Sequence, residues 1–499
     1  MVRPLKVLFV SAEVAPFSTV GGLSQVSYFL PRALIKHGLD VRIFTPKYGT
    51  LDEKKFPTTK VMELPVEDLV CNVKTQERTL KGDPIVYFLE NMEYFEKRAN
   101  VYNYVDDPIR FSLLSRGALE FVKSGIFIPD LIHCNDWHTG YLIDYLRKIY
   151  KNNPTFKKMS AILSVHNLYQ GMFDFAHASQ MDFDDGKSDP LPFFSEDLIK
   201  QNALKRGVMY ADLINTVSET YSREVMRPDF GWGLDELFKE IRGKVFGVLN
   251  GLDYKEFNSS SDKLIKKNFN QNNLSAREEN KKDLQKEFNL NQDPNVPIVS
   301  FEGRLDYQKG LEIIMETIQF LLDEFDIQFI IMGGGDDRYR QFFLDLEKKY
   351  PGRVGTHLMP NWSLPRKIFA GSDIMLFPSY YEPGGIVAME GMHYGAVPVA
   401  RATGGLADSI INFDPLKNTG TGFLFKDFSA MSFITAMVRA LETYRRKPVW
   451  QGIIKRAMTT DFSWDRTALK YLDLYERAIR FHGESLSINP PMAFKQTNT

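Results

Sequence analysis

Two basic side chains stand close together in residues 303–310, which read GRLDYQKG. Arg304 and Lys309 follow the short apolar run 298–301 and precede the helical pattern 311–322, so they lie at the end of a predicted strand. A guanidinium can hold a phosphate through two parallel hydrogen bonds, whereas an ammonium acts as a point charge. The two cations therefore suit a diphosphate, and they could stabilise a nucleoside diphosphate leaving group without a metal ion.

An acidic residue occupies the equivalent place after the apolar run 374–377, in residues 379–385, which read SYYEPGG. The Glu382 carboxylate can accept hydrogen bonds from neighbouring sugar hydroxyls, while Gly384 and Gly385 leave backbone N–H groups open to a ligand. Glu390 follows eight residues after Glu382. We predict that it lies on roughly the same face of the next helix.

Two further glycine turns follow predicted strands. Thr403, Gly404 and Gly405 come after the apolar run 397–400 and could offer N–H groups to a phosphate. Gly21 and Gly22 come after the first apolar run of the chain and could do the same. A turn from strand to helix also needs glycine for steric reasons, so this pair alone is weak evidence. It lacks the G-x-G-x-x-G fingerprint, which disfavours a dinucleotide-dependent oxidoreductase.

Polar residues also follow two strands predicted in the first half of the chain. His133, Asp136 and His138 lie at the end of one run, and His166 and Asn167 lie at the end of another. Three histidines and one aspartate spread over two strand ends, without an H-E-x-x-H motif, make a weak metal signature. Hydrogen bonding to sugar hydroxyls explains the mixture better, and we predict no metal site.

The segment 182–184, which reads DFD, could be mistaken for a metal-binding D-x-D motif. Its neighbours Asp185, Gly186 and Lys187 are typical of an exposed loop. We therefore give this segment little weight as a metal site.

The elements that must position these residues are short apolar runs alternating with longer helical patterns. Between the first two runs, Val26, Phe29, Leu30, Ala33 and Leu34 form the stripe of an amphipathic helix. Such runs are typical of buried parallel strands, which predicts a doubly wound α/β fold. The runs are 7–10, 41–44, 131–133, 162–165, 298–301, 329–332, 374–377 and 397–400.

A change of composition divides the chain. Residues 258–297 are rich in Asn, Ser, Lys, Gln and Glu, and within them 276–288 predicts a surface helix at the start of a second domain. We predict domains at 1–257 and 258–475, followed by a tail at 476–499 that could pack back on the first domain. Ligands of doubly wound sheets bind at the carboxyl ends of the strands, so we expect the site between the domains.

The bulk composition excludes several classes of protein. The 499 residues include 62 basic and 63 acidic side chains, so no global charge recruits nucleic acid or an anionic membrane. Cys71 and Cys134 are too far apart in sequence to indicate a disulfide framework or zinc site, which fits a reducing cytoplasm. No apolar run approaches the length of a membrane-spanning helix. We expect a soluble cytoplasmic protein that binds neither membrane nor nucleic acid.

Taken together and in order, these motifs resemble the bacterial glycogen and starch synthases, glycosyltransferase family 5. The likeness runs nearly end to end and leaves only about the last 20 residues unmatched. It rests on segments 6–17, 21–23, 136–138, 166–167, 250–254, 303–305, 308–310, 382–383, 403–408 and 462–465.

The resemblance implies a GT-B fold, in which two Rossmann-like domains face a central cleft. It also implies a retaining hexosyltransferase that moves glucose from ADP-glucose or UDP-glucose to the 4-hydroxyl at the non-reducing end of an α-1,4-glucan, without metal or other cofactor. The leaving phosphate would take the acceptor proton. The first domain would be the acceptor side and the second the donor side.

Roles follow by motif match. Arg304 and Lys309 would hold the diphosphate, Glu382 the glucose hydroxyls, and Asp136 and His166 would face the glucose, with the His166 carbonyl stabilising oxocarbenium character. The resemblance assigns the remaining positions to donor contacts, at Gly21, Gly22, Gly384, Gly385, Glu390, Thr403, Gly404 and Gly405, and to sugar or acceptor contacts, at Asn167 and Asn250.

Three departures from the family pattern keep other readings open. Thr19 stands where many members have a phosphate-contacting Lys, the segment 166–171 is one residue shorter than usual, and Glu390 replaces a common Tyr. Pro360 falls near the place of the nucleobase-stacking aromatic, with Trp362 as a nearby candidate. The alternatives are a retaining GT-B enzyme with a different donor or a small acceptor, and a catalytically silent glucan-binding relative.

Overall fold

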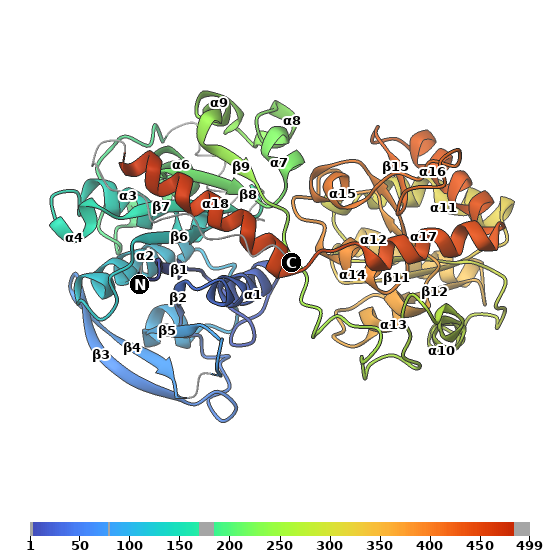
Figure 1. The fold of residues 1–499 in the computed structure, drawn as a ribbon, viewed down its shortest axis with the longest axis horizontal. Coiled ribbons are helices and arrows are strands. Elements are labelled where there is room, and N and C mark those ends of the chain that lie inside the picture. Colours follow the sequence, from blue (N-terminus) through green and yellow to red (C-terminus); the bar gives the residue numbers. More distant parts are fainter. Residues whose placement is uncertain (1–2, 78–79, 169–183, 484–499) are drawn as a thin grey trace. The chain divides into compact units, whose positions relative to one another are not determined.

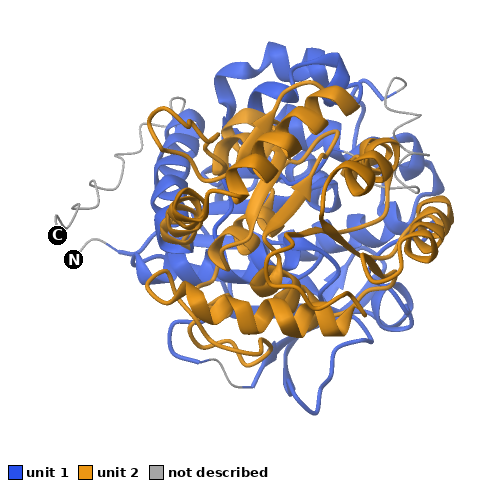
Figure 2. Ribbon diagram, turned by 90° about the vertical axis from the view of Figure 1, so that its right-hand side faces the viewer, with its two compact units in different colours: residues 1–217, 222–251, 464–499 blue, residues 218–221, 252–463 orange. Residues whose placement is uncertain are grey.

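The computed structural model describes residues 3–77, 80–168 and 184–483. The chain divides into two compact units (Figure 2): unit 1 comprises residues 1–217, 222–251 and 464–499, and unit 2 comprises 218–221 and 252–463. The chain passes from unit 1 to unit 2 between Gly251 and Leu252 and returns between Ser463 and Trp464. The boundary proposed from composition, 257–258, lies shortly after the first passage, and the proposed tail begins inside the last helix of unit 1.

Unit 1 is built on one sheet, which among the described residues has the strand order β3-β4-β5-β2-β1-β6-β7-β8-β9. The pairs β3–β4 and β4–β5 are antiparallel, and all the other pairs are parallel. The order of the parallel strands therefore reverses between β1 and β6, as in a Rossmann sheet. The strands are β1 (Lys6–Val10), β2 (Asp40–Pro46), β3 (Thr58–Val66), β4 (Leu69–Gln76), β5 (Ile85–Glu90), β6 (Leu131–Asn135), β7 (Ser160–Val165), β8 (Leu213–Thr216) and β9 (Val245–Gly247).

Helices complete the core of unit 1. The predicted stripe on α1 is confirmed, because Val26, Leu30, Ala33 and Leu34 are buried in one core cluster with alternate residues of β1. The helices are α1 (Gly22–Lys36), α2 (Asp107–Lys123), α3 (Gly140–Lys148), α4 (Pro154–Lys157), α6 (Ala203–Tyr210), α8 (Pro228–Gly231), α9 (Asp235–Glu240) and α18 (Trp464–Gly483), and α7 (Glu219–Glu224) is divided between the two units.

The last described helix, α18, returns to the first unit and packs against α1, β7 and β8 (Figure 1). Its buried tyrosines meet polar groups of the sheet: the Tyr475 hydroxyl lies 2.8 Å from His133 Nδ1, and Asn215 Nδ2 donates to the Tyr471 hydroxyl at 2.9 Å. These pairings satisfy polar groups that would be costly to bury alone. Helix α18 is therefore part of the core of unit 1.

Unit 2 is a second doubly wound sheet, with parallel pairing throughout and the order β12-β11-β10-β13-β14-β15. This is the classical 3-2-1-4-5-6 order, which reverses between β10 and β13. Its strands are β10 (Ile298–Glu302), β11 (Gln328–Met332), β12 (Val354–His357), β13 (Ile374–Phe377), β14 (Val397–Arg401) and β15 (Phe423–Phe425). Its helices are α10 (Arg277–Glu287), α11 (Leu311–Glu324), α12 (Asp337–Lys349), α13 (Leu364–Gly371), α14 (Ile386–His393), α15 (Gly404–Ser409), α16 (Ala430–Tyr444) and α17 (Lys447–Thr459).

The sequence predictions for these elements are confirmed. Each of the eight apolar runs lies in a strand, and the helix expected at 276–288 is α10. The inner side of α10 is buried, with Leu284 in a core cluster and Lys281 Nζ 2.8 Å from the Asp373 carboxylate. The charged residues of α10 therefore take part in the packing of the buried side as well as in the exposed surface.

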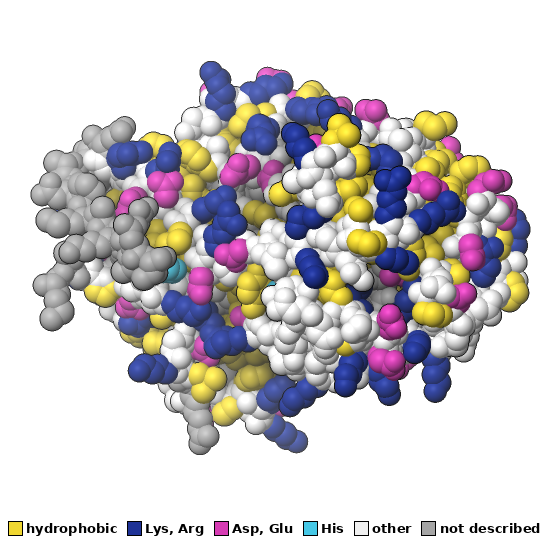
Figure 3. Space-filling view, turned by 45° about the vertical axis from the view of Figure 1, so that its right-hand side comes forward, with side chains coloured by type: hydrophobic (Ala, Val, Ile, Leu, Met, Phe, Trp, Pro, Cys, Tyr) yellow, Lys and Arg dark blue, Asp and Glu magenta, His cyan; other side chains and the backbone are white. Residues whose placement is uncertain are grey.

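The surface carries no dominant charge on the face drawn in Figure 3, where basic and acidic side chains are interspersed. This fits the net charge of -1 and means that any anion on this face must be held by local groups. None of the helices in the described part of the chain is long and apolar enough to span a membrane.

Candidate functional site

The predicted site residues cluster at the point where each sheet reverses its strand order. In unit 1, Asp136 follows β6 and the Gly21 turn follows β1, and these two strands are neighbours. In unit 2, the loop of Arg304 and Lys309 follows β10, and Glu382 follows its neighbour β13. Crevices outside the carboxyl ends of strands at such a switch point are the usual ligand sites of these sheets.

The cation loop of unit 2 is a turn with its own side-chain support. Asp306 caps the short 3-10 helix η6 (Tyr307–Lys309), and its carboxylate also lies 3.0 Å from Arg304 Nη1. Arg304 Nη2 donates to Gln308 Oε1 at 2.7 Å. The Arg304 side chain is nevertheless 61% exposed, so the guanidinium is oriented while still open to an anion.

Lys309 and Glu382 form the central contact of the unit 2 site. Lys309 Nζ donates to Glu382 Oε2 at 2.7 Å, and Ser379 Oγ donates to the same oxygen at 3.0 Å. Both ionic side chains are largely buried. Within the described residues no donor contacts the other carboxylate oxygen, Oε1. The pair can therefore present an ammonium to a phosphate and a carboxylate oxygen to a hydroxyl.

Two further carboxyl groups lie near this pair, and one of them was missed in the sequence. Glu390 is 7% exposed on α14, and burial together with the charge of Glu302 raises the pKa of Glu390 to about 8. Burial raises the pKa of Glu302 to about 7, while the nearby Lys309 charge opposes that rise. Glu302 is the last residue of β10, and an acidic residue at the end of an apolar run was the signal that the sequence offered.

Helix α14 begins at Ile386, so Glu382 precedes it and shares no helix with Glu390.

The glycines of the predicted phosphate turns in unit 2 bring two backbone segments together. A Cβ at Gly404 would lie 2.1 Å from the Glu382 carbonyl oxygen, and one at Gly405 would lie 2.1 Å from that of Gly384. The Gly405 N–H donates to the Glu382 carbonyl at 2.8 Å. Gly385 has a φ of +64°, which favours glycine. The close approach of the two backbone segments therefore explains why glycine occupies these positions. Phosphate binding by these glycines and by the buried Thr403 stays a prediction.

In unit 1 the glycine turn already holds a carboxylate of the protein itself. The Val20 and Gly21 N–H groups donate to Glu13 Oε2 at 2.7 and 3.1 Å, and the Tyr102 hydroxyl donates to Oε1 at 3.0 Å. Glu13 is 3% exposed, and burial raises its pKa to about 7. Sequence reasoning missed Glu13, and it assigned Gly21 and Gly22 to the donor. Gly22 is the first residue of α1.

Asp136 has an unusual backbone that holds its side chain against β7. Its φ of 55° and ψ of −174° lie in a region that residues other than glycine rarely adopt, and such strain often marks functional sites. Asp136 Oδ1 accepts the His166 backbone N–H at 2.6 Å, and burial raises the pKa of this carboxyl to about 7. His166 Nε2 lies 3.0 Å from Asn135 Oδ1. Burial lowers the His166 pKa to about 3, so its ring is neutral.

Of the remaining polar residues predicted in unit 1, some stabilise the core and others stay candidates for the site. His133 contacts Tyr475 and Ser164 inside the core, so it is a structural residue. Asn250 is buried, and its Oδ1 has no donor among the described residues. Asn167 directly follows His166, whereas residues 169–171 of the same motif lie outside the described residues. No group of three or more His, Cys, Asp or Glu that could hold a metal occurs in residues 3–77, 80–168 and 184–483.

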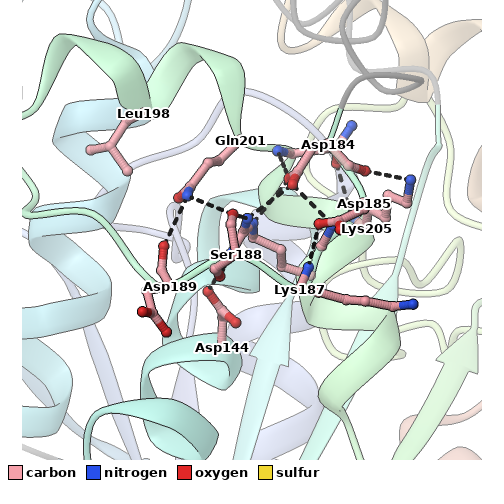
Figure 4. Close-up of polar contacts among 12 residues, drawn as sticks. Asp144, Asp184, Asp185, Lys187, Ser188, Asp189, Leu198, Gln201 and Lys205 are labelled. Atoms are coloured by element: carbon pink, nitrogen blue, oxygen red, sulfur yellow. Dashed lines mark hydrogen bonds and ion pairs between the residues drawn. The ribbon is translucent and has the colours of Figure 1, made fainter.

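The expectation of an exposed loop at the D-x-D segment is wrong for Asp184. This residue is 4% exposed, and its two carboxylate oxygens each accept a 2.9 Å hydrogen bond from Arg206 (Figure 4). Arg206 also contacts Asp144 at 3.0 Å. Asp184 is a partner in a buried ion-pair network, while residues 182 and 183 lie outside the described residues.

Comparison with known proteins gives matches along nearly the whole chain. Residues 6–240 match the family model described as the starch synthase catalytic domain, and residues 281–451 match that of glycosyl transferases group 1. The chain is 36% identical to a glycogen synthase of Desulforamulus reducens, over 96% of this chain and 100% of the relative. It is 37% identical to a glycogen synthase of Thermotoga maritima, over 95% and 99%.

Solved structures give a related result. The catalytic domain of starch synthase IV from Arabidopsis thaliana, bound to ADP and acarbose, matches with a TM-score of 0.82 and 28% identity, over 95% of this chain and 99% of that one. Sucrose-phosphate synthase from Thermosynechococcus elongatus matches with a TM-score of 0.58 and 18% identity, which speaks for the fold alone.

Proposed function

The chain belongs to the family of bacterial glycogen and starch synthases, glycosyltransferases with the GT-B fold, and we propose that it transfers glucose from ADP-glucose or UDP-glucose to the non-reducing 4-hydroxyl of an α-1,4-glucan with retention of configuration. The relatives named glycogen synthase support the glucan product. The starch synthase IV structure contains ADP, which favours ADP-glucose as the donor.

The observation that carries this proposal is the contact of Lys309 with Glu382 at the switch point of unit 2. A nucleotide sugar presents a diphosphate and a ring of hydroxyls next to each other. In our proposal Lys309 and the exposed Arg304 bind the diphosphate, and Glu382 Oε1 accepts a glucose hydroxyl. One ion pair thus serves both halves of the donor, and unit 2 is the donor side.

Unit 1 takes the acceptor side in this proposal. A neutral His166 can accept or donate one hydrogen bond without adding charge, and Asp136 is held in place by the His166 N–H. The open Oδ1 of Asn250 offers an acceptor to a hydroxyl proton. These groups would orient sugar hydroxyls and exclude water.

The reaction that fits these groups needs no further base. The bond between glucose C1 and the phosphate oxygen breaks, a bond between C1 and the acceptor O4 forms on the same face, and the 4-hydroxyl proton passes to the leaving phosphate. Arg304 and Lys309 stabilise the negative charge that develops on that phosphate. We propose that no metal ion takes part and that the enzyme works in the cytoplasm, where its two free cysteines, Cys71 and Cys134, would stay reduced.

The pair Glu302 and Glu390 favours a second candidate, a retaining enzyme with a different donor. Glu302 lies near Lys309, and Glu390 lies near Glu302, so the two carboxyls could select hydroxyls that the usual donor lacks. Thr19 also favours a different donor, because it stands where many family members have a Lys that contacts the donor phosphate, and it cannot supply that charge.

The test is transfer of radiolabelled glucose to glycogen, with ADP-glucose and UDP-glucose offered in parallel. Glu382→Gln keeps the size of the side chain and removes its charge, and Glu316→Gln, on the exposed side of α11, is the matched control. Each reaction is run with and without EDTA. Digestion of the product by an enzyme that cuts only α-1,4 links reports the stereochemistry.

The proposal is supported if glucose is incorporated from one donor, and if this incorporation is lost in Glu382→Gln and kept in Glu316→Gln. The donor that works identifies the nucleobase of the nucleotide sugar. Loss of activity in EDTA with rescue by Mn²⁺ would refute the metal-free mechanism. Folded protein that transfers glucose from neither donor would turn attention to the second candidate, tested next with a panel of other nucleotide sugars and small acceptors.

A further inference from the structure

Three aromatic side chains form a partly exposed cluster beside the unit 2 site, which we call the aromatic rim: Tyr307, Tyr380 and Phe428. Their ring centroids are separated by 5.3 Å between Tyr307 and Tyr380, 5.2 Å between Tyr380 and Phe428, and 6.4 Å between Tyr307 and Phe428. Tyr307 keeps 53% of its surface exposed. Large aromatics exposed in a group are uncommon on a soluble surface and often mark a binding site.

The aromatic rim is continuous with the catalytic loops. Tyr307 stands two residues before Lys309, and Tyr380 stands two residues before Glu382. The Tyr380 N–H donates to the Gln308 carbonyl at 2.8 Å, which joins the two loops. A ligand that contacts the rim would therefore lie next to the groups proposed to hold the donor.

The rim is also held in a fixed shape. The guanidinium of Arg401 lies 5.9 Å from the Tyr380 ring and 5.7 Å from the Phe428 ring, and its Nε donates to the Lys426 carbonyl at 3.1 Å. Phe428 packs against the turn at Gly310, where a Cβ would meet its ring at 3.2 Å. Binding to such a preformed surface loses little conformational entropy.

We infer that the aromatic rim is a subsite for a glucose unit of the acceptor glucan. A pyranose has an apolar face of C–H groups and an edge of hydroxyls, and tyrosine offers an apolar ring with a polar tip. The planes within the cluster are inclined by 46°, 61° and 80°, so they form a faceted surface rather than a parallel slot. Such a surface fits a puckered sugar ring better than a flat nucleobase. The inference rests on the proposed function, since it assigns that acceptor a place on unit 2.

The experiment measures binding separately from catalysis. Wild type, Tyr307→Ala and Tyr307→Phe are titrated with maltoheptaose and, independently, with ADP by calorimetry. Phe320→Ala, which removes an exposed aromatic from α11, is the matched control. Because Tyr307 is half exposed, its replacement leaves the core of unit 2 intact. We expect Tyr307→Ala to weaken maltoheptaose binding about fivefold to tenfold and to leave ADP binding unchanged.

The outcomes separate the inference from the proposed function. Unchanged maltoheptaose affinity in Tyr307→Ala, with wild type binding the glucan, overturns the subsite and leaves the proposed function standing. Weaker ADP binding in Tyr307→Ala would assign the rim to the nucleotide and likewise overturn it. Wild-type protein that binds ADP but no glucan overturns the proposed acceptor and the subsite with it. Intermediate loss in Tyr307→Phe would locate part of the binding in the phenol hydroxyl.

Discussion

The Gly21 backbone N–H donates to the carboxylate of Glu13 at 3.1 Å. A glycine turn before a helix normally leaves such groups for an external anion. Here the protein supplies its own acceptor from the loop that follows β1, and the Val20 N–H and the Tyr102 hydroxyl also donate to it. Phosphate can reach these two N–H groups only if Glu13 leaves them, so in the proposed function Arg304 and Lys309 would bind the diphosphate without this turn.

Replacing Glu13 should loosen this turn. Glu13→Ala removes the acceptor of two backbone N–H groups, and a hydrogen bond to a charged acceptor contributes about 1.5–3 kcal/mol. We expect faster amide hydrogen exchange at Val20 and Gly21 in this variant. Glu13→Gln keeps one acceptor oxygen and should show a smaller increase. Equal protection in wild type and Glu13→Ala would show that other groups hold the turn.

The two cations of unit 2 should be essential for turnover and dispensable for folding. Arg304→Ala and Lys309→Ala should each lower kcat/KM about 100-fold or more, because each removes a charge that stabilises the leaving diphosphate. Lys348→Ala, which removes an exposed cation from α12, is the control. Circular dichroism checks the fold. Near-normal kcat/KM in a folded variant would remove that residue from the mechanism.

Because the pKa of Glu390 is raised to about 8, we expect the proposed donor binding to depend on pH. Deprotonation of Glu390 and Glu302 as pH rises from about 7 to 9 adds negative charge near Lys309, so the KM for the nucleotide sugar should increase. Glu390→Gln cannot ionise and should flatten this rise. A pH profile of donor KM that is identical in both proteins would contradict this account.

The raised pKa of Glu390 also lowers the stability of the folded protein as pH rises. A carboxyl whose pKa is raised in the folded state binds more protons folded than unfolded, so its contribution falls as pH rises from about 4.5 to 8. Glu390→Gln should therefore be more heat-resistant than wild type at pH 8.5, and this advantage should shrink at pH 6. Thermal unfolding followed at both pH values measures the difference.

The buried network of Asp184 predicts a large structural effect. Arg206→Ala leaves the buried Asp184 without its ion-pair partner, while Asp144 keeps Lys148 at 2.9 Å, and breaking such a buried pair typically destabilises a protein by about 3–5 kcal/mol. The midpoint of thermal unfolding should fall by several degrees. Asp185→Asn changes the exposed neighbour and should shift it little. A small effect of Arg206→Ala would mean that water replaces the guanidinium.

Much of the fold follows from local pattern, because a buried parallel strand is apolar on both faces and stands out as a short run. The hairpin strands β3 and β4 were not predicted because their exposed positions interrupt such runs with polar residues. The strands β5, β8, β9, β12 and β15 were not predicted either. Arg304, Lys309 and Glu382 could be predicted as site residues because each follows a recognisable strand, and their roles stay predictions. Glu13 and Glu302 could not be assigned, since their environments depend on burial and on Val20, Tyr102 and Lys309, which only folding brings near.

The return of α18 to unit 1 sets the order in which the protein can fold during its synthesis. Unit 2 is essentially continuous in sequence and can form as soon as residue 463 has left the ribosome, whereas unit 1 lacks Tyr471 and Tyr475 until α18 emerges. At 5–20 residues per second, making residues 252–463 takes roughly 10–40 s. For that interval His133 and Asn215 lack their final partners, so the half of the chain made first is the half completed last.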